Sequence, residues 1–503
     1  MKSFVGLTVT WLALATTLVG HAGGGSTLMK RDPNAMTDRM RPQYHFLPAS
    51  NWMNDPNGLI QFNGVYHIFY QRNPFAATWG PMYWGHAESH DLVHWRLMPD
   101  ALKPDSPADK GGVWTGCMVD DKGAPTAIYT GVEPQCVCIA TGNRDLSRFT
   151  KYVGNPVVPA QQQAMGLTGF RDPYVWKQGS WWMMVVGAGI PGKGGELLLY
   201  RSRDLRQWES RGTAFVGDRD QHPDMWECPN LFRLGTKWVL IISNGQTWWY
   251  TGTFRNGRFS PEKTGLLDAG NSLYAPQTFK DARGRRILFG WLRENRSDAE
   301  AHGWQGVMSL PRILKVDANG DLTQAPAPEL QRLRARSTHA TAIKLTQREG
   351  FLPLKDFEKL GDECELQAVL KPGQAGRVGL VVAATPDGVE QTRIEYNVRR
   401  GGIDVDRSRS SLSKSADAGT VFLPAELDSA GEIRLRIFVD RSVIEIYTAD
   451  GQCMAVRIYP TRPDAMAMGV TGDPGGAIEA LRVNRMRSAI PSVGAAEIEP
   501  TQE

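Results

Sequence analysis

A single unit of sequence recurs five times along the first part of the chain, and this repeat limits the fold more than any other feature. Each copy starts with a short motif that usually ends in proline, and continues as a strand, a tight turn and a strongly apolar strand. Turn residues such as Asn63-Gly64 favour hairpins, because both positions tolerate a positive φ. The copies read DPNGLIQFNGVYHIFYQ, WTGCMVDDKGAPTAIYTGV, DPYVWKQGSWWMMVVGAG, CPNLFRLGTKWVLIIS and APQTFKDARGRRILFGW, of which the second is the weakest match.

The spacing of the copies predicts a β-propeller with five blades. The motif prolines are Pro56, Pro173, Pro229 and Pro276, with Cys117 near the expected place in the second copy, which gives a period of about fifty residues. Further strand-like stretches such as LLLYRSRDLRQWES lie between the copies and bring each unit to roughly four strands. A pair of β-sandwiches is the rival architecture, and the fixed period with a constant opening motif argues against it.

The repeat ends after LPRILKV, and the remainder of the chain has a different pattern. Residues 327–350, APELQRLRARSTHATAIKLTQREG, are interpreted as a short helical linker. From 351 to 490, short strands alternate apolar and polar residues, as in IRLRIFVDRSVIEIYTADG, which predicts a β-sandwich. We therefore expect an all-β chain with the propeller at 41–326, the sandwich at 351–490 and a frayed tail at 491–503.

The N-terminal residues 1–22, MKSFVGLTVTWLALATTLVGHA, have the features of a secretory signal peptide. Lys2 gives the positive start, an apolar run follows, and small residues stand near Ala22. A membrane anchor is the alternative, but the run is at the short end for crossing a bilayer. We expect residues 23–40 to be a flexible segment, and the mature protein to be secreted or periplasmic without a membrane span.

Composition argues against a nucleic-acid partner, a disulfide scaffold and a zinc site. The 57 basic and 53 acidic residues give a net charge of +4 without a basic stripe, so nucleic acid is not an expected partner. Six cysteines in 503 residues are too few for a disulfide scaffold, and they lack zinc-like spacing. We expect them to be mostly small buried residues.

Three acidic residues stand at the openings of different copies of the repeat. Asp55 and Asp172 each precede a motif proline, and Glu227 is one residue earlier in its copy. If the motif opens the innermost strand of each blade, these carboxylates face one central funnel. Crowding should raise the pKa of at least one, and a pair of carboxyl groups with different pKa values is what glycoside hydrolysis needs. Asp-Pro is also common in turns, and that alternative applies to Asp55 taken alone.

Other ionisable residues have simpler interpretations. We expect four aspartates to be solvated loop residues: Asp105, Asp109, Asp218 and Asp220. The spaced histidines, His86, His90 and His94, lie in a region that reads as strands, so packing or loop roles are favoured over metal binding. The proposed chemistry needs no metal and no cofactor.

The motifs WMNDPNG, FRDP and WECPN resemble the three signatures of glycoside hydrolase family 32, the invertases, levanases, inulinases and related β-fructosidases. FYQRNP, MYWGHAESHDLVHW, YAPQTF, MSLPR and FVDRSVIEIY extend the resemblance over about 45–486. It implies a five-bladed propeller followed by a β-sandwich. It also implies that Asp55 is the nucleophile, Glu227 the acid/base, and Asp172 a residue that binds fructose hydroxyls and stabilises the transition state.

The same resemblance implies a set of substrate-binding residues. Side chains that would contact the fructosyl unit are Asn54, Gln71, Trp79 and Arg171, while Trp52 and Trp114 would be aromatic walls that Trp291 joins. Tryptophans also commonly pack cores, and that alternative holds for each of them. Thr115 is also expected to bind substrate; serine is usual at this position, and threonine keeps the hydroxyl. The chain departs from the family pattern there and at Arg72 and Asn230. The last change could alter leaving-group preference.

The expected function is an exported retaining β-fructofuranosidase that hydrolyses terminal fructosyl residues of sucrose or fructans through a covalent intermediate on Asp55. A fructosyltransferase with the same catalytic residues is the alternative, and a non-catalytic fructan-binding propeller is a third possibility. The preference among sucrose, inulin and levan, the exo or endo mode of action, the oligomeric state and the role of the sandwich stay open.

Overall fold

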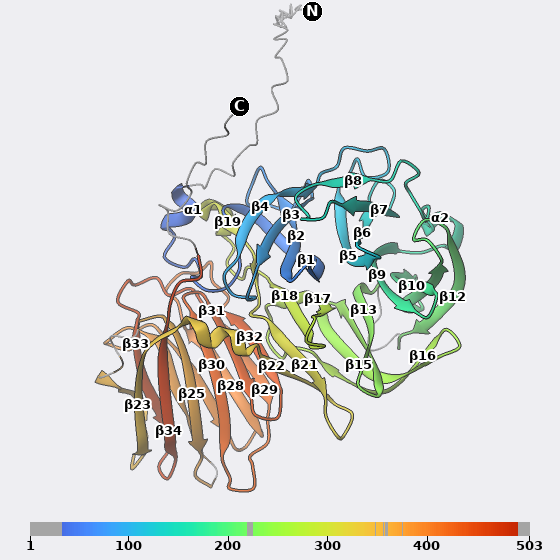
Figure 1. The fold of residues 1–503 in the computed structure, drawn as a ribbon. Coiled ribbons are helices and arrows are strands. Elements are labelled where there is room, and N and C mark those ends of the chain that lie inside the picture. The colour runs from blue at the N-terminus through green and yellow to red at the C-terminus, as the bar shows by residue number, and fades with distance from the viewer. Residues whose placement is uncertain are drawn as a thin grey trace, which may run out of the picture.

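Five small sheets stand side by side in a ring, and a pair of larger sheets lies next to them (Figure 1). The computed structural model describes residues 33–218, 225–347, 349–355, 357, 361–374 and 376–490. The predicted signal peptide and the predicted tail at 491–503 lie outside the described residues. The expected five-bladed propeller with a C-terminal β-sandwich is confirmed.

Each blade is built from consecutive strands, as the repeat predicts. Blade one contains β1 (Asn51–Phe62), β2 (Val65–Asn73), β3 (Tyr83–Ser89) and β4 (Arg96–Leu102). Blade two contains β5 (Val113–Asp121), β6 (Ala124–Gly131), β7 (Cys136–Gly142) and β8 (Phe149–Lys151). Blade three contains β9 (Gly169–Gln178), β10 (Trp181–Ile190), β11 (Gly194–Ser202) and β12 (Trp208–Val216).

Blade four contains β13 (Glu227–Leu234), β14 (Lys237–Asn244), β15 (Gln246–Arg255) and β16 (Arg258–Leu266). Blade five contains β17 (Leu273–Lys280), β18 (Arg286–Leu292), β21 (Arg312–Val316) and β22 (Leu322–Pro326), with the short β20 (Val307–Met308) also paired to β18. The first strand of every blade, β1, β5, β9, β13 or β17, contacts the first strands of the two neighbouring blades. The openings of the five repeats therefore surround one axis.

A short strand from the end of the propeller closes the ring. β19 (Trp304–Gln305) leaves blade five and pairs in parallel with β1, placing Trp304 beside Asn51 and Gln305 beside Trp52. Trp304 is fully buried, and its indole nitrogen donates to Asp38 Oδ2 at 2.9 Å. The N-terminal segment, the first blade and the last blade therefore contact one another at the place where the ring closes.

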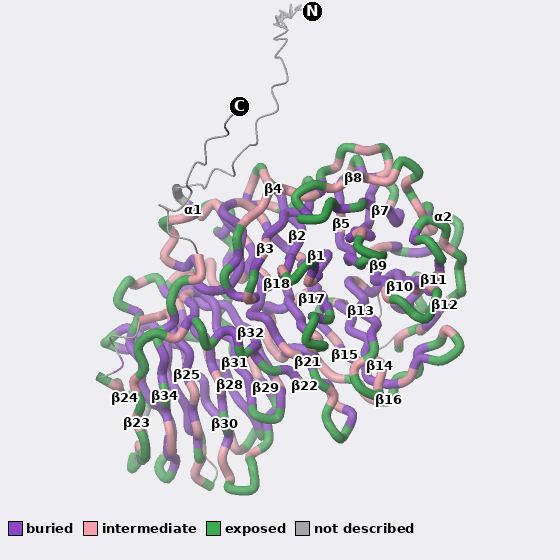
Figure 2. The backbone as a smooth tube through the Cα atoms, viewed as in Figure 1, coloured by how far each residue is buried: buried purple, intermediate pink, exposed green. Residues whose placement is uncertain are grey.

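The sandwich consists of two six-stranded sheets. One has the order β23 (Arg334–Lys344), β34 (Ala477–Met486), β25 (Glu363–Lys371), β30 (Ile433–Asp440), β31 (Val443–Thr448) and β32 (Cys453–Arg457). The other has the order β24 (Glu349–Pro353), β33 (Ala467–Gly472), β26 (Arg377–Ala384), β27 (Gln391–Asn397), β28 (Gly402–Arg409) and β29 (Thr420–Pro424). The predicted alternation in β30 is confirmed, because Leu435, Ile437 and Val439 are buried in the core between the sheets. Figure 2 shows the strands largely buried and the turns exposed.

Two expected segments differ from the structure. The linker at 327–350 is shorter than expected: η2 (Pro328–Leu333) is a 3₁₀ helix, and from Arg334 onward the chain is already the edge strand β23. In the segment expected to be flexible, residues 33–37 form α1 and Ala35 and Met40 are buried. The remaining short helices are α2 (Gln162–Met165) and η1 (Ala299–His302), and no helix among the described residues is long and apolar enough to cross a membrane.

Buried ionic contacts fasten the sandwich to the propeller. Asp440, in the FVDRSVIEIY stretch, accepts the backbone N–H groups of Gln43, Tyr44 and His45 at 2.7–2.9 Å. Glu445 accepts the backbone N–H of Leu310 at 2.7 Å and contacts His45 Nε2 at 3.2 Å. These two carboxylates are fully buried, so they hold three distant parts of the chain in one arrangement.

Candidate active site

A β-bulge lies at the same place in the first strand of every blade. The register with the second strand shifts at the repeat motif in β1, β5, β9, β13 and β17. Three residues that precede a motif proline, Asp172, Cys228 and Ala275, have φ values of 63°, 49° and 47°. Bulges re-aim side chains, and a positive φ outside glycine marks backbone strain that is typical of functional sites. The motif therefore turns its side chains out of the ladder and toward the axis.

The residues two positions before the motif proline, or its equivalent in blade two, form a ring of polar side chains. They are, in blade order, Asn54, Thr115, Arg171, Glu227 and Tyr274. Arg171 Nη2 donates to Glu227 Oε1 at 2.7 Å, and the Tyr274 hydroxyl donates to Glu227 Oε2. Both oxygens of Glu227 are thus held by donors, while about one third of its side chain (32%) stays exposed to incoming substrate.

Tyr274 was not among the residues predicted from the sequence. It stands two places before Pro276 in the fifth copy, which is the place that Glu227 occupies in the fourth. Comparing the copies position by position would have found it. Arg293 lies over the Tyr274 ring with its guanidinium carbon 4.8 Å from the ring centroid.

Asp55 is held at both carboxylate oxygens by two short chains of hydrogen bonds. Thr115 Oγ1 donates to Oδ2 at 2.6 Å, and Gln71 Nε2 donates in turn to Thr115 Oγ1 at 2.6 Å. Asn54 Nδ2 donates to Oδ1 at 3.1 Å, and Trp52 Nε1 donates to Asn54 Oδ1 at 2.7 Å. Burial raises the pKa of Asp55, and the hydrogen bonds from Thr115 and Asn54 oppose that rise.

Asp172 lies deeper, with 4% of its surface exposed. Its Oδ2 accepts the backbone N–H of Cys228 at 2.9 Å and lies 4.0 Å from Arg171 Nε. Burial raises the pKa of Asp172 to about 7; Arg171 opposes this shift, while the negative charges of Glu227 and Asp55 add to it. The sequence predicted that crowding of the carboxylates would raise the pKa of at least one of them. The pKa of Asp172 is raised, and burial contributes more to the rise than the neighbouring negative charges do.

Cys228 joins the three carboxylates. Its thiol lies 3.5 Å from Asp55 Oδ2 and 3.6 Å from Asp172 Oδ2, and Glu227 is its neighbour in the chain. Burial raises the pKa of the Cys228 thiol well above its usual value, so it keeps its one proton and can donate it to either aspartate. Residues from blades one, three and four therefore meet at one point.

The four predicted tryptophans flank this point in two pairs. Trp52 and Trp291 have ring centroids 5.8 Å apart, and Trp79 and Trp114 have centroids 5.7 Å apart. The Arg171 guanidinium lies 5.9 Å from the centroid of Trp114. The described structure thus brings together all eleven residues that the sequence analysis placed at the site.

Besides Thr115, the two other departures from the family pattern, at Asn230 and Arg72, contact neighbouring protein groups. Asn230 is fully buried, and its Nδ2 donates to the carbonyls of Cys228 and Pro276, each at 3.0 Å. It therefore ties the bulge of blade four to that of blade five. Arg72 is buried and pairs with Asp100 at 2.6 Å.

Some of the simpler expectations hold and one is wrong. His86 stacks on Phe69 with centroids 4.2 Å apart, which confirms a packing role, and all six cysteines are buried free thiols. Asp109 is not a solvated loop residue: it is fully buried and accepts from the Tyr129 hydroxyl at 2.8 Å. Lys151 pairs with it at 2.6 Å, and this pairing lets a carboxylate sit in the core of blade two.

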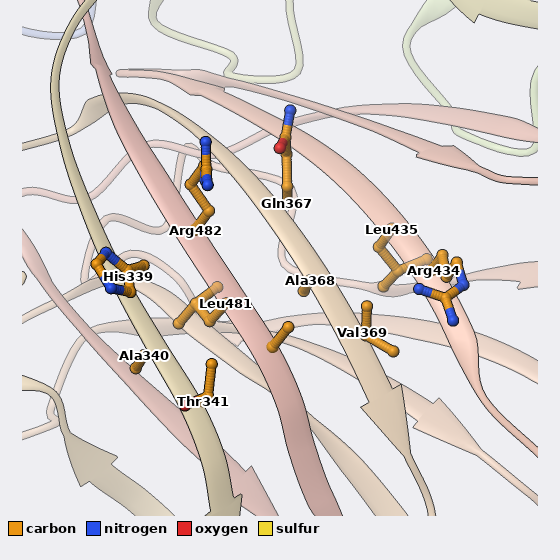
Figure 3. A pocket seen from close by; sticks show the side chains of 11 residues that line it. His339, Ala340, Thr341, Gln367, Ala368, Val369, Arg434, Leu435, Leu481 and Arg482 are labelled. Carbon is orange, nitrogen blue, oxygen red and sulfur yellow. The ribbon is translucent and has the colours of Figure 1, made fainter.

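A separate hollow of about 440 Å³ opens on the sandwich across β23, β34, β25 and β30 (Figure 3). Gln367, Arg434 and Arg482 are among its lining side chains, and none of the lining residues is an aspartate or a glutamate. It lacks the paired carboxyl groups that glycoside hydrolysis requires. The candidate active site is therefore the carboxylate cluster of the propeller and not this hollow.

Comparison with known proteins agrees with this location. The glycosyl hydrolases family 32 N-terminal domain matches residues 45–326, and the family 32 C-terminal domain matches residues 329–484. Sucrose-6-phosphate hydrolase of Escherichia coli is 34% identical over 468 residues, which cover 87% of this chain and 93% of that protein. Levanase of Bacillus subtilis (strain 168) is 33% identical over 486 residues, covering 87% of this chain and 69% of that protein.

Solved structures give the same result. Fructan 1-exohydrolase IIa from Cichorium intybus matches with a TM-score of 0.81 at 28% identity, covering 90% of this chain and 98% of that one. The β-fructofuranosidase of Bombyx mori matches with a TM-score of 0.74 at 28% identity, covering 90% and 95%. The resemblance noted in the sequence motifs is thereby confirmed.

Proposed function

The chain belongs to glycoside hydrolase family 32 and is a β-fructofuranosidase acting on sucrose or fructans; within that activity, we propose that it is an exported enzyme that retains configuration through a covalent fructosyl-enzyme on Asp55. The convergence of Asp55, Asp172 and Glu227 around Cys228 is the observation that carries this proposal. The apolar N-terminal stretch of the sequence supports export.

In the first step, an ionised Asp55 oxygen attacks the anomeric carbon of the terminal fructosyl unit. Glu227 gives its proton to the glycosidic oxygen, so the bond breaks and the leaving group departs as a neutral alcohol. In the second step Glu227, now a carboxylate, takes a proton from water, and the resulting hydroxide oxygen displaces Asp55 from the same carbon. Two displacements at one carbon return the original configuration.

The surrounding side chains have distinct tasks in this scheme. Thr115 and Asn54 hold the two Asp55 oxygens, so attack needs no reorientation of the carboxylate. Asp172 accepts hydrogen bonds from hydroxyl groups of the sugar in this scheme, and the negative charge of its ionised form favours the oxocarbenium-like transition state. Arg171 and Tyr274 fix the position of Glu227.

The test is a product profile on sucrose, inulin and levan. We expect free fructose as the main product at low substrate, and a loss of more than about 1,000-fold in kcat/KM for Glu227→Gln on sucrose. The matched control is Glu209→Gln, which removes an exposed carboxylate of blade three and should leave the rate unchanged. Oligofructans as the main product at low sucrose would instead support the transferase alternative, and full activity of Glu227→Gln would refute the assigned role. N-terminal sequencing of the protein from the culture medium or periplasm tests export.

A further inference from the structure

One loop carries the exposed aromatic side chains of the propeller. Among the described residues, only Phe75 and Trp79 are aromatic side chains with exposures above half, at 69% and 57%. Both lie in the loop between β2 and β3, residues 74–82. Single exposed apolar side chains are common, but two large exposed rings in one loop point to a ligand.

The loop is held rigidly. Asn51 Nδ2 donates to the Pro74 carbonyl at 2.7 Å, and the backbone N–H of Trp52 donates to the Ala76 carbonyl at 3.1 Å. Gln305 Nε2 donates to the Ala77 carbonyl at 2.6 Å. A pre-organised loop loses little conformational entropy when a ligand binds, so its rings are suited to recognition.

Ring contacts link this loop to its neighbours. Trp79 meets Trp114 edge to face at 5.7 Å, and Trp114 is followed in the chain by Thr115, which donates to Asp55. Phe75 meets Tyr83 edge to face at 5.8 Å. A substrate with its terminal unit at Asp55 would leave its remaining units near this loop.

The chemistry of the loop selects for a neutral ligand. Residues 73–82, NPFAATWGPM, contain no charged side chain. Apolar ring faces pack against the C–H faces of sugars, and the loop has no charged side chain that could pair with an ionised ligand.

We propose that Phe75 extends the aromatic surface of Trp79 into a binding site for the fructosyl units of a fructan chain that lie beyond the unit held at Asp55. This inference rests on the proposed function and deepens it. Phe75 is the specificity-determining residue, because sucrose has only one unit beyond the scissile bond whereas inulin and levan extend past Trp79.

The test compares Phe75→Ala on a short and a long substrate. We expect KM for inulin to rise about tenfold with kcat nearly unchanged, since an aromatic contact is lost, while kcat/KM for sucrose stays within about twofold. Phe75→Tyr keeps the ring and should restore the wild-type KM for inulin. Leu412→Ala, which removes another exposed apolar side chain, on the sandwich, is the control and should change kcat/KM for neither substrate.

A binding measurement separates this inference from the proposed function. In the Glu227→Gln background, calorimetry with inulin oligosaccharides should show about tenfold weaker binding when Phe75→Ala is added. Equal losses on sucrose and inulin, or no loss on either, would overturn the inference while the hydrolase stands. A wild-type protein that cleaves no fructoside, yet whose binding of inulin depends on Phe75, would instead overturn the proposed function.

Discussion

At the residue scale, the carboxylate of Asp55 has its protonation set by opposing influences. Burial favours the neutral acid, whereas the Thr115 hydroxyl and the Asn54 amide favour the anion that attacks. Since only the anion is a nucleophile, kcat/KM should fall on the acid side as pH drops through the raised pKa of Asp55.

Thr115→Val tests this balance. It removes the hydroxyl that favours ionised Asp55, so the pKa of Asp55 should rise further and the acid limb of the kcat/KM profile should move to higher pH. We expect about a tenfold loss of kcat/KM at neutral pH. Thr126→Val, an equally buried substitution away from the carboxylates, is the control. A pH profile that falls in amplitude without moving would contradict the assignment.

Asp172→Asn should raise the stability of the protein and lower its activity. The pKa of Asp172 rises from 3.8 to about 7 on folding, so the folded state holds a proton that the unfolded state releases between those values. Wild-type stability therefore falls as pH rises through that window. The asparagine does not titrate, so we expect its melting temperature to exceed that of the wild type by about 2–4 °C near pH 8, with little difference near pH 4. kcat should fall at least about 100-fold, and a variant less stable at both pH values would refute this explanation.

At the scale of elements, the bulge in the first strand of each blade explains why the repeat motif carries the chemistry. The blades, the motif positions and the three carboxylates could be predicted from the sequence, because motif prolines, turn glycines and alternating apolar residues recur in each copy of the repeat. It did not reveal the positive φ of Asp172 and Cys228, since those arise from fitting the bulge into the ring. Tyr274 was missed because a tyrosine in an apolar strand normally signals packing.

Edge strand β23 was missed for a related reason. Its residues, RARSTHATAIK, are mostly exposed, so they lack the apolar alternation by which strands are recognised. Asp109 was wrongly expected in solvent, because its partners Tyr129 and Lys151 are distant in the sequence.

Ring closure gives a prediction at this scale. Gly306 has φ +86°, and a Cβ there would lie 2.0 Å from the Met53 carbonyl oxygen, beside the β1–β19 pairing. Gly306→Ala should therefore destabilise the protein by about 3 kcal/mol or more. Gly235→Ala, in a hairpin turn with φ +63° and open space, isolates the backbone effect and should cost about 1 kcal/mol. Denaturation midpoints measure both, and equal losses would show that the close approach to Met53 does not matter.

At the scale of the whole molecule, the sandwich has a structural role that the sequence left open. It carries Asp440, which binds the N-terminal segment, and Glu445, which binds the connection between β20 and β21 in blade five. His45 lies between them, with Nδ1 2.8 Å from Asp440 Oδ2. Burial alone would lower the pKa of His45, but the two carboxylates raise it above its usual value.

His45→Gln should therefore have a pH-dependent effect. The stabilisation from charged His45 is fully present below its unfolded pKa and is lost as pH rises through the raised folded value. We expect the variant to be about 3 kcal/mol less stable than the wild type at mildly acidic pH, and the gap to narrow at alkaline pH. His94→Gln, which removes an exposed histidine paired with Asp91, should have almost no effect. A gap that is the same at every pH would point to packing alone.

The covalent intermediate tests the convergence of the three carboxylates most directly. Glu227→Ala should be incubated with a nitrophenyl β-fructofuranoside, whose leaving group needs no protonation, and the protein then mapped by peptide mass spectrometry. Because the second step lacks its base, we predict a burst of nitrophenolate and one fructosyl unit attached to the peptide that contains Asp55. A label on another residue, or a burst without any label, would contradict the account.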